Sequence, residues 1–393
     1  MNIFHYNPTC EMAIANGSPY YVAPALLRQF EQDLAPIMAL FANEYDWVVC
    51  EQKPPPSHVA QLRILGVNRV DFIEIDELKN WRSNHPMNEI ELHSWGKSPA
   101  EAYRFSFLVE PDLIWQAAYS TLFERKTAAQ FLQLFLSQNQ HLPIVDKNTT
   151  IQVINSIPEV EGLLEEWSPL VLKAPLSSSG RGLLVLRRNR LNEANRQLIS
   201  AVLKQQGYMT AEKWHQKVAD LSFQFEVTPS GNINYLGMSR FFTNSNGQYS
   251  GHYLGQAPLI PAGFDAGQLS EVAEQLGEAL AKSVYSELHR GPLGVDALLF
   301  RDNSHQVKLH PCLEINPRYT MGYLALVLQS RIHSEANGEF RVQYFEPGEL
   351  AGFIDEETKK NPPILVDGLI RKGFLALNPT TPQSRFCTFL RLF

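Results

Sequence analysis

The chain has 393 residues, 44% of them hydrophobic and 19% charged, a composition that fits a globular protein of roughly two to three domains. Its net charge of -7 and its lack of a long Lys or Arg run argue against a nucleic-acid backbone or an anionic membrane as the main partner. The start lacks the basic and apolar regions of a signal peptide, and no apolar stretch nears the roughly 18 residues that span a bilayer, so we expect a cytoplasmic protein.

Short apolar runs alternate with helical patterns through the first 110 residues. The pattern predicts strands at 3–6, 46–50 and 72–75, and helices at 24–41 and 57–65, with Ser57 as the cap of the second helix. Strands that alternate with helices in this way form a parallel sheet with crossover connections. We therefore predict an α/β domain over residues 1–117.

Asn7 and Glu11 lie just after the first predicted strand. Ligands of open α/β sheets bind beyond the carboxyl ends of the strands, so these two side chains are candidates for contacts with an amine. The alternative is an ordinary helix start in which Thr9 is the N-cap. The sequence leaves both interpretations open.

A helical pattern over 117–136 leads into a second unit, in which an apolar strand at 171–175 contains Lys173. A loop of small residues over 176–182 follows, and then another strand at 183–186. Such a loop exposes backbone N–H groups to an anion, and the lysine adds positive charge. It is not a Walker loop, because G-K-[ST] is absent and a strand follows instead of a helix. The alternative is a flexible Ser/Gly turn.

The rest of the chain alternates between helices and hairpins. The predicted elements are a helix at 192–206, a hairpin of strands 222–227 and 233–242, a helix at 265–289, a hairpin of strands 295–300 and 307–316, and a small α/β tail over the last fifty residues. His215, His252 and His310 lie near these segments, but none has a Ser or Cys at a spacing that suggests a nucleophile. We expect structural roles for all three histidines.

The last hairpin carries the strongest chemical signal. Asp296 lies on its first strand, and Glu314 and Asn316 lie on its second strand, with Arg318 two residues further on. Strand side chains alternate between faces, so Glu314 and Asn316 share one face. Their hard oxygens suit Mg²⁺, and a nearby arginine suits a phosphoryl oxygen. The alternative is a polar edge strand with a solvated face.

The register of this hairpin decides whether the three ligands can meet. If Phe300 pairs with Lys308, then Asp296 lies opposite Cys312 on the ligand face, and the three ligands can converge. Pro311 cannot donate to the ladder and can shift this register through a bulge.

The order of these motifs resembles that of the ATP-grasp ligases. The motifs are, in chain order, Lys173, the Ser/Gly loop, Glu212-Lys213-Trp214, Asp220, Asp296 and Glu314-Ile315-Asn316-Pro317-Arg318. The segment 212–214 is similar to the hinge of D-alanine:D-alanine ligases, and 314–318 looks like the corresponding segment of biotin carboxylase and its relatives. The resemblance covers about residues 118 to 322. It implies an α/β chain, α+β in the lid, with an ATP-grasp fold and an N-terminal parallel-sheet pre-ATP-grasp domain.

The resemblance also implies two cofactors, ATP and Mg²⁺, with Mn²⁺ as a substitute. Glu212 and Trp214 would meet the adenine mainly through backbone groups, and Asp220 would accept from the ribose hydroxyls. The residues implied in nucleotide binding are Lys126 or Arg125, Lys173, Ser178, Ser179, Gly180, Gly182, Glu212, Lys213, Trp214 and Asp220. The residues implied in metal binding are Asp296, Glu314 and Asn316.

Arg240 and Arg318 are the candidates for catalytic arginines. Arg240 lies in the strand at 233–242, and Arg318 follows the metal ligands. A guanidinium offers a fork of donors to a carboxylate, an acyl phosphate or a tetrahedral oxyanion. The alternative for each is an exposed arginine with a solvated role.

The resemblance implies a division into a pre-ATP-grasp domain at 1–117, a lid-bearing part at 118–215, a part with the metal ligands at 216–340 and a tail at 341–393 packed on the ATP-grasp domain. The predicted activity is an ATP- and Mg²⁺-dependent ligase that joins a small carboxylate to an amine through an acyl phosphate. The alternatives are a phosphotransferase on the same fold and a nucleotide-binding regulator without turnover. The expected partners are small-molecule substrates and a second copy of the chain in a homodimer, with no nucleic acid and no membrane.

Overall fold

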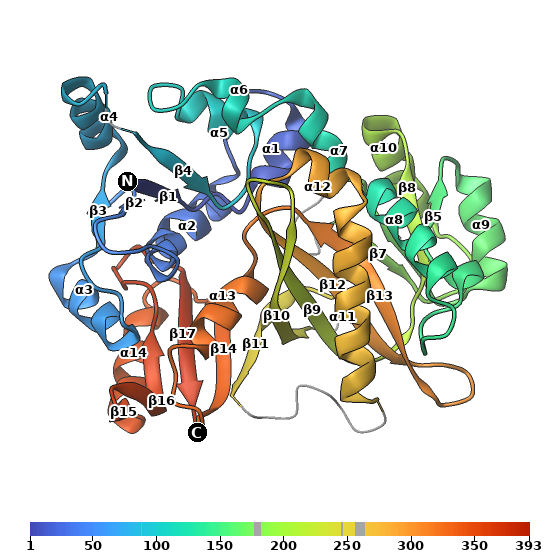
Figure 1. Ribbon diagram of the computed structural model, residues 1–393. Helices are drawn as coiled ribbons and strands as arrows, with labels where there is room; N and C mark the ends of the chain where they lie inside the picture. Colours follow the sequence, from blue (N-terminus) through green and yellow to red (C-terminus); the bar gives the residue numbers. More distant parts are fainter. Residues whose placement is uncertain (88, 177–181, 245–246, 256–263) are drawn as a thin grey trace. The chain divides into compact units, whose positions relative to one another are not determined.

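The computed structural model describes residues 1–87, 89–176, 182–244, 247–255 and 264–393 (Figure 1). The chain divides into two compact units. The first comprises Met1–Gln116, Ser250–Leu259 and Arg318–Phe393, and the second comprises Ala117–Tyr249 and Ile260–Pro317. No helix among the described residues combines enough length and apolar character to cross a membrane.

The first unit begins with a parallel sheet in the strand order β3-β2-β1-β4, as the sequence predicts (Figure 1). Its strands are apolar where they meet the helices, and its crossover connections are helical. The elements of this part are β1 (Asn2–His5), α1 (Cys10–Asn16), α2 (Ala25–Leu34), η1 (Ala35–Leu40), β2 (Trp47–Val49), α3 (Pro56–Leu62), η2 (Arg63–Leu65), β3 (Asp71–Ile73), α4 (Ile75–Asn84), β4 (Glu91–Ser94), α5 (Pro99–Arg104) and α6 (Pro111–Ile114).

The C-terminal part of the first unit is an antiparallel arrangement in which β14 pairs with β11 and β17, and β16 pairs with β17 and β15. It confirms the predicted α/β character of the last fifty residues. Its elements are β11 (Tyr249–Gly255), α13 (Met321–Gln329), β14 (Asn337–Tyr344), α14 (Glu349–Lys360), β15 (Ile364–Val366), β16 (Leu369–Ala376) and β17 (Phe386–Leu392).

The second unit contains an antiparallel group of strands in the order β13-β12-β9-β10, which we call the main sheet. Both predicted hairpins are present, β9 with β10 and β12 with β13. One face of the main sheet packs against α8 and α11 in an apolar core. The elements are η3 (Ala117–Tyr119), α7 (Ser120–Phe123), α8 (Arg125–Gln138), β9 (Gln216–Val227), β10 (Ile233–Thr243), α11 (Ala266–Ala281), α12 (Val284–Leu288), β12 (Gly291–Arg301) and β13 (Val307–Asn316).

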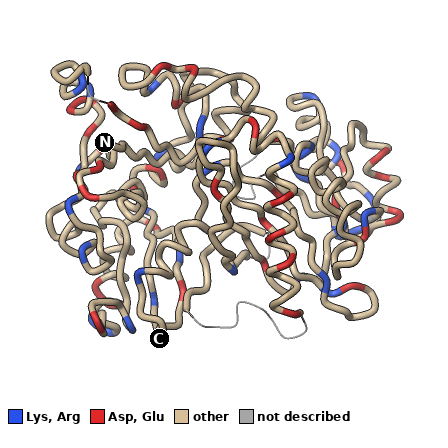
Figure 2. The backbone as a smooth tube through the Cα atoms, in the orientation of Figure 1, with Lys and Arg blue, Asp and Glu red and all other residues tan. Residues whose placement is uncertain are grey.

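Helix α11 shows how the pattern of residues directs this packing. Leu269, Val272 and Leu276 recur at helical spacing on its buried side. Acidic residues follow the other side of the helix, where they are exposed (Figure 2). The helix therefore covers the sheet with its apolar face and leaves its charges in water.

The second unit also contains a smaller sheet in the order β5-β8-β6-β7, which we call the small sheet. Its apolar face packs against α9 and α10. The elements are η4 (Lys147–Thr149), β5 (Gln152–Ile154), α9 (Ile157–Glu166), β6 (Leu170–Lys173), β7 (Leu183–Leu186), α10 (Glu193–Gln206) and β8 (Met209–Lys213). The predicted strands on either side of the Ser/Gly loop are thus β6 and β7, which pair antiparallel.

Two predicted helices are interrupted in the structure. The helix expected at 117–136 breaks at Glu124, whose extended backbone separates α7 from α8. The helix expected at 265–289 ends at Ala281, and Ser283 starts α12 by accepting a hydrogen bond from the N–H of Tyr285. Apolar periodicity continues across both breaks, so it could not show them.

Two predicted caps are wrong. Helix α3 starts at Pro56 after Pro55, because proline suits the first helical position, and Ser57 lies inside the helix. Thr9 does occupy the N-cap position of α1, but its side chain does not cap the helix. The Thr9 hydroxyl instead donates to Glu31 at 2.6 Å.

Three buried histidines and one partly buried histidine predict that the fold is sensitive to acid. Burial lowers the pKa of His58 and His215 to about 4 and that of His252 and His310 to about 3. The unfolded chain then binds more protons than the folded chain once the pH falls below about 6.5. The free energy of unfolding should therefore fall as the pH decreases from about 6.5 toward 4, by about 1.4 kcal/mol per pH unit for each histidine.

Denaturant unfolding at pH 7.5, 6 and 5 measures this slope. A His58→Leu variant should show a shallower slope than the wild type, because one of the four proton-binding groups is gone. A free energy of unfolding that stays constant between pH 6.5 and 5 would contradict the prediction.

Candidate functional site

The register of β12 and β13 brings the predicted metal ligands together. Phe300 pairs with Lys308, as expected, but Asp296 pairs with Glu314. The prediction that Asp296 lies opposite Cys312 is wrong, because a bulge sets the single residue Ala297 of β12 against 311–313 of β13. Pro311 lies in this bulge, where its missing N–H costs no ladder bond. The bulge therefore moves Glu314 directly opposite Asp296.

Asp296 is the centre of a hydrogen-bonded group. Its Oδ1 accepts from the hydroxyl of Ser222 at 2.6 Å, and its Oδ2 accepts from Nδ2 of Asn316 at 3.1 Å. Asn316 is buried, whereas the Glu314 side chain is about one third exposed. The two carboxylates and the amide thus meet on one face of the main sheet, with their oxygens held by polar neighbours.

These residues fit a magnesium ion. Two carboxylates and an amide oxygen are hard oxygen ligands, the kind that Mg²⁺ takes in proteins. Within the described part of the chain, no three His, Cys, Asp or Glu side chains form a ready metal cluster. Asp296 and Glu314 are instead a pair, and the third donor is the amide of Asn316.

Arg125 is the basic residue of α8 that faces this group. Its Nη2 lies 3.0 Å from a carboxylate oxygen of Glu314, and its Nε donates to the carbonyl of Ala174 at 3.0 Å. Lys126 instead pairs with Glu124 at 2.8 Å and lies over the ring of Tyr208. Of the two candidates that the sequence leaves open, the structure brings Arg125 to the predicted metal ligands.

Lys173 and Glu212 form a buried ion pair on the small sheet, with 2.5 Å between Nζ and Oε1. Lys173 pairs in register with Thr210, and Glu212 with Val171, so the two side chains belong to one face of the sheet. The opposite face carries the apolar core of the small sheet. Lys173 therefore lies on the polar face of the small sheet, where it is paired with Glu212.

The predicted hinge is the end of β8. Glu212 and Lys213 are its last residues, and Trp214 follows. The N–H of Trp214 donates to the carbonyl of Pro169 at 2.9 Å, so this backbone donor is already used. The indole lies under the guanidinium of Arg187, with 5.9 Å between Cζ and the ring centroid.

Asp220 lies on the same face of the main sheet as Asp296, two residues before Ser222 on β9. It is buried, and its Oδ2 accepts from Nζ of Lys217 at 2.8 Å and from the hydroxyl of Thr243 at 2.7 Å. A carboxylate held in this way is a fixed acceptor, which suits the predicted contact to ribose hydroxyls.

Residues 177–181 of the predicted phosphate loop, which include Ser178, Ser179 and Gly180, lie outside the described residues. Gly182 is described, and its carbonyl accepts from the N–H of Ala174 at 3.0 Å. This bond closes the base of the loop between β6 and β7.

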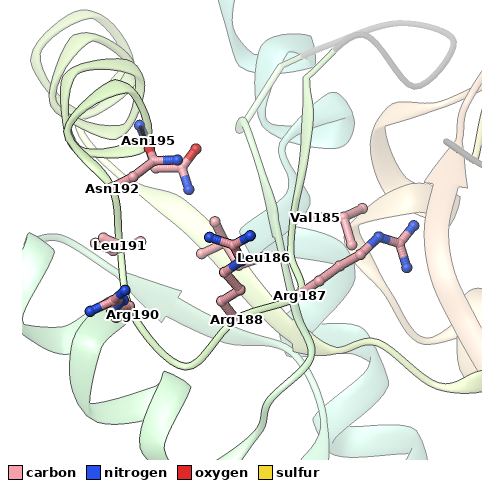
Figure 3. Close-up of a pocket in the computed structure, with 8 residues that line it drawn as sticks. All are labelled: Val185, Leu186, Arg187, Arg188, Arg190, Leu191, Asn192 and Asn195. Atoms are coloured by element: carbon pink, nitrogen blue, oxygen red, sulfur yellow. Dashed lines mark hydrogen bonds between the residues drawn. The ribbon is translucent and has the colours of Figure 1, made fainter.

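A pocket of about 570 Å³ lies on the small sheet, between the end of β7 and the start of α10 (Figure 3). Arg188 and Arg190 line it together with Asn192 and Asn195, and Arg187 points away from them toward the other side. None of the residues predicted to bind the nucleotide or the metal lines this pocket.

The two candidate catalytic arginines have different surroundings. Arg240 pairs with Leu221, whose side chain belongs to the apolar core of the main sheet. Because directly opposite residues share a face, Arg240 lies on the face away from Asp296, and the register does not bring it to the metal ligands. The role predicted for Arg240, the binding of the reacting carboxylate, stays a prediction.

Arg318 is a residue of the first unit, where it is largely buried. Its Nε donates to Glu11 at 2.8 Å, and its Nη1 donates to the carbonyl of Tyr319 at 3.1 Å. Asn7, the other candidate beyond the first strand, uses its amide to accept from the N–H of Gly96 and to donate to the Gly96 carbonyl. Glu11 is therefore the partner of an arginine, and Asn7 holds the backbone after β4.

Sequence analysis did not single out Ser222 and Gln224. Ser222 donates to Asp296, and the amide of Gln224 donates to Ser222 at 2.7 Å, so the three form a hydrogen-bonded chain. Both residues are polar positions in an otherwise apolar, alternating strand. That alternation was a usable signal, since buried polar side chains need a partner.

Comparison with known proteins gives one relative by sequence. No protein-family model matches the chain. Over 198 residues it is 29% identical to the "[Butirosin acyl-carrier protein]--L-glutamate ligase" of Niallia circulans, a match that covers 49% of this chain and 43% of that protein. The chain thus spans less than half the length of this curated relative.

Solved structures resemble the whole chain. An ADP complex of N5-carboxyaminoimidazole ribonucleotide synthetase has a TM-score of 0.50 at 14% identity, over 100% of this chain and 92% of that one. The second structure is the biotin carboxylase domain of Hydrogenobacter thermophilus 2-oxoglutarate carboxylase, crystallised with MgADP, ADP and bicarbonate. It also has a TM-score of 0.50, is 11% identical in sequence, and the match covers 100% of this chain and 86% of that one. Both of these proteins are ATP-grasp enzymes. The chain therefore has the ATP-grasp fold, as its motifs indicate.

Proposed function

We propose that this protein is an ATP- and Mg²⁺-dependent ligase that joins a carboxylate to an amine. The observation that carries the proposal is the register of β12 and β13, which sets Asp296 opposite Glu314 and Asn316 beside Asp296. Arg125 adds a positive charge at Glu314, and Lys173 adds one on the polar face of the small sheet. The relative matched by sequence is named a ligase, which supports the same class of reaction.

In this proposal Asp296, Glu314 and Asn316 would hold the metal, which would neutralise the charge that develops on the phosphates during transfer. Ser222 and its partner Gln224 fix the Asp296 carboxylate before the metal arrives. Such prior orientation lowers the cost of assembling the site. Glu314 would exchange part of its contact with Arg125 for the metal, which would release guanidinium donors for phosphate.

The proposed chemistry has two steps. A substrate carboxylate oxygen attacks the γ-phosphorus of ATP, the bond to the β,γ-bridging oxygen breaks, and ADP leaves. An amine then attacks the acyl carbon and loses a proton, and inorganic phosphate leaves. No side-chain nucleophile is needed, and Arg318 would stabilise the oxyanion of the second step.

The substrates belong to the proposal as classes only. The relative's name specifies L-glutamate and an acyl-carrier protein, so an amino acid and a carrier-bound group are the first candidates to test. A homodimer is the proposed assembly, and the four-part division at 117, 215 and 340 is the proposed domain organisation.

Binding of the nucleotide is the first test. ATP or ADP with Mg²⁺ should raise the melting temperature, because a ligand that binds only the folded state stabilises it by about 2.7 kcal/mol at one hundred times its Kd. Mg²⁺ alone is the control. Millimolar nucleotide that leaves the melting temperature unchanged and gives no calorimetric heat would refute the nucleotide site.

Trapping of the intermediate tests the ligase step. Amino acids, dipeptides and other small carboxylates are screened for ADP release in the presence of hydroxylamine. A ligase of this kind should give a hydroxamate of the active carboxylate, since hydroxylamine replaces the amine. ADP release with a stable phosphorylated acceptor and no hydroxamate would identify a phosphotransferase instead.

A further inference from the structure

His310 lies on the same face of the main sheet as the predicted metal ligands. Ser222, Asp296 and Glu314 are aligned across β9, β12 and β13, and Asp220, Leu298 and His310 are aligned in the next row on that face. Rows that are two residues apart on β12 are separated by roughly 6.6 Å. A ligand that reaches from the metal toward Asp220 therefore passes over the row that contains His310.

The imidazole of His310 has no hydrogen-bond partner in the part of the chain that the structure describes. Only 1% of the residue is exposed, and neither ring nitrogen makes a hydrogen bond. A buried ring that forms no hydrogen bond loses those it would make with water, which destabilises the protein. A polar group that arrives from outside the chain would remove this cost.

Further buried polar atoms without a hydrogen bond lie in the same region. The hydroxyl of Thr210 belongs to the polar face of the small sheet, and the hydroxyl of Ser239 lies beside Ser222 in register. Together with His310, they come from both sheets of the second unit. Several orphaned polar groups in one region suit the binding of a polar ligand better than the needs of a core.

The surroundings of His310 hold its ring in the neutral form. Burial and the positive charge of Lys173 lower the pKa of His310 to about 3. The ring of His215, next to the hinge, has its centroid 6.2 Å from that of His310 and 4.0 Å from that of Phe300. At neutral pH the ring therefore offers one N–H donor and one acceptor nitrogen.

We propose that His310 is a binding residue for the nucleoside part of ATP, to which its imidazole makes a hydrogen bond. The inference rests on the proposed nucleotide site and adds a contact to it. Asp296 and Glu314 would hold the metal and phosphates in one row, while Asp220 and His310 would flank the nucleoside in the next. The expectation that His310 has a purely structural role is replaced by this assignment.

The test compares ligands that share phosphates but differ in the nucleoside. Calorimetry with Mg²⁺ measures the Kd of ATP, of ADP and of inorganic tripolyphosphate for the wild type and for His310→Leu. The variant should bind ATP and ADP roughly fivefold more weakly, the change in Kd that corresponds to a hydrogen bond of about 1 kcal/mol, and should bind tripolyphosphate as the wild type does. In turnover, KM for ATP should rise while kcat changes little, because this contact is the same in the ground and transition states.

Two further variants separate binding from folding. His310→Gln keeps a donor and an acceptor and should restore most of the nucleotide affinity, and it also serves if His310→Leu fails to fold. His252→Leu removes another buried histidine, on β11, and should leave the affinity for ATP unchanged. Melting temperatures of all variants without ligand show any structural loss separately.

The outcomes distinguish this inference from the proposed function. A wild type that binds no nucleotide refutes both. A wild type that binds ATP, with equal affinity in His310→Leu, refutes the role of His310 alone. An equal loss of affinity for ATP and for tripolyphosphate in His310→Leu would also overturn the role of His310, since the loss of affinity would then not depend on the nucleoside.

Discussion

Glu314→Gln should lower Mg²⁺-dependent ADP formation on the order of a hundredfold or more, because it removes a charged oxygen of the proposed metal site directly opposite Asp296. Several kcal/mol of transition-state stabilisation are expected from such a metal site. Asn316→Ala should have a similar effect, since it deletes the amide that contacts Asp296. Steady-state ADP release across a range of Mg²⁺ and Mn²⁺ concentrations measures both.

The fold should survive these changes. Glu314 is partly exposed and glutamine has the same shape, although the buried guanidinium of Arg125 loses its counter-charge and the melting temperature should fall. Glu339→Gln is the matched control, because Glu339 also pairs with an arginine, Arg341, at 2.8 Å. Near wild-type turnover in both Glu314→Gln and Asn316→Ala would show that the metal ligands are wrongly assigned.

The sequence predicted the second unit well where alternation and turns are local signals. The strands of both hairpins follow from period-two patterns, and the Lys173 strand follows from its apolar run. The breaks at Glu124 and Ser283 could not be predicted, because the apolar helical pattern continues through them. A break depends on backbone geometry at one residue, which periodicity does not encode.

The pairing of Asp296 with Glu314 shows a second limit. The sequence contains Pro311, which indicates that the ladder is disturbed, but not how many residues the bulge takes up. The number decides which side chain faces Asp296. Here three residues of β13 lie opposite one residue of β12, so Glu314 faces Asp296 where Cys312 was expected. The position of Glu314 therefore depends on the length of the bulge, which the alternation of side chains does not reveal.

The packing of neighbouring elements explains the remaining differences between the predicted site and the observed one. The choice between Arg125 and Lys126 depends on which side of α8 faces β13, and helical pattern alone does not fix this within one residue. Arg240 has the right chemistry for a carboxylate, but its pairing with Leu221 sets it on the core face. In both cases the residue type is informative, and the register or helix face decides whether it can act.

Arg318 is the residue that we propose for stabilising the oxyanion. It follows Asn316 by two residues in sequence, and its guanidinium is oriented by Glu11 and by the carbonyl of Tyr319. Gly96 packs beside it, since a Cβ there would lie 3.5 Å from Cδ of Arg318 and would overlap the sulfur of Cys10. An arginine fixed on several sides loses little freedom when it binds an anion.

Arg318→Lys should therefore lower kcat on the order of a hundredfold while changing the affinity for ATP far less. A lysine can keep an ion pair with Glu11, so the fold should be retained, but its single ammonium cannot reproduce the guanidinium fork on an acyl phosphate or a tetrahedral oxyanion. Single-turnover measurements with an identified substrate pair separate binding from the chemical step. Arg341→Lys is the control, as another arginine in an ion pair of the first unit. If kcat were unchanged in Arg318→Lys, Arg318 would be structural. Arg240 lies on the other face of the main sheet, so it could take over this role only if the strand register changed during turnover.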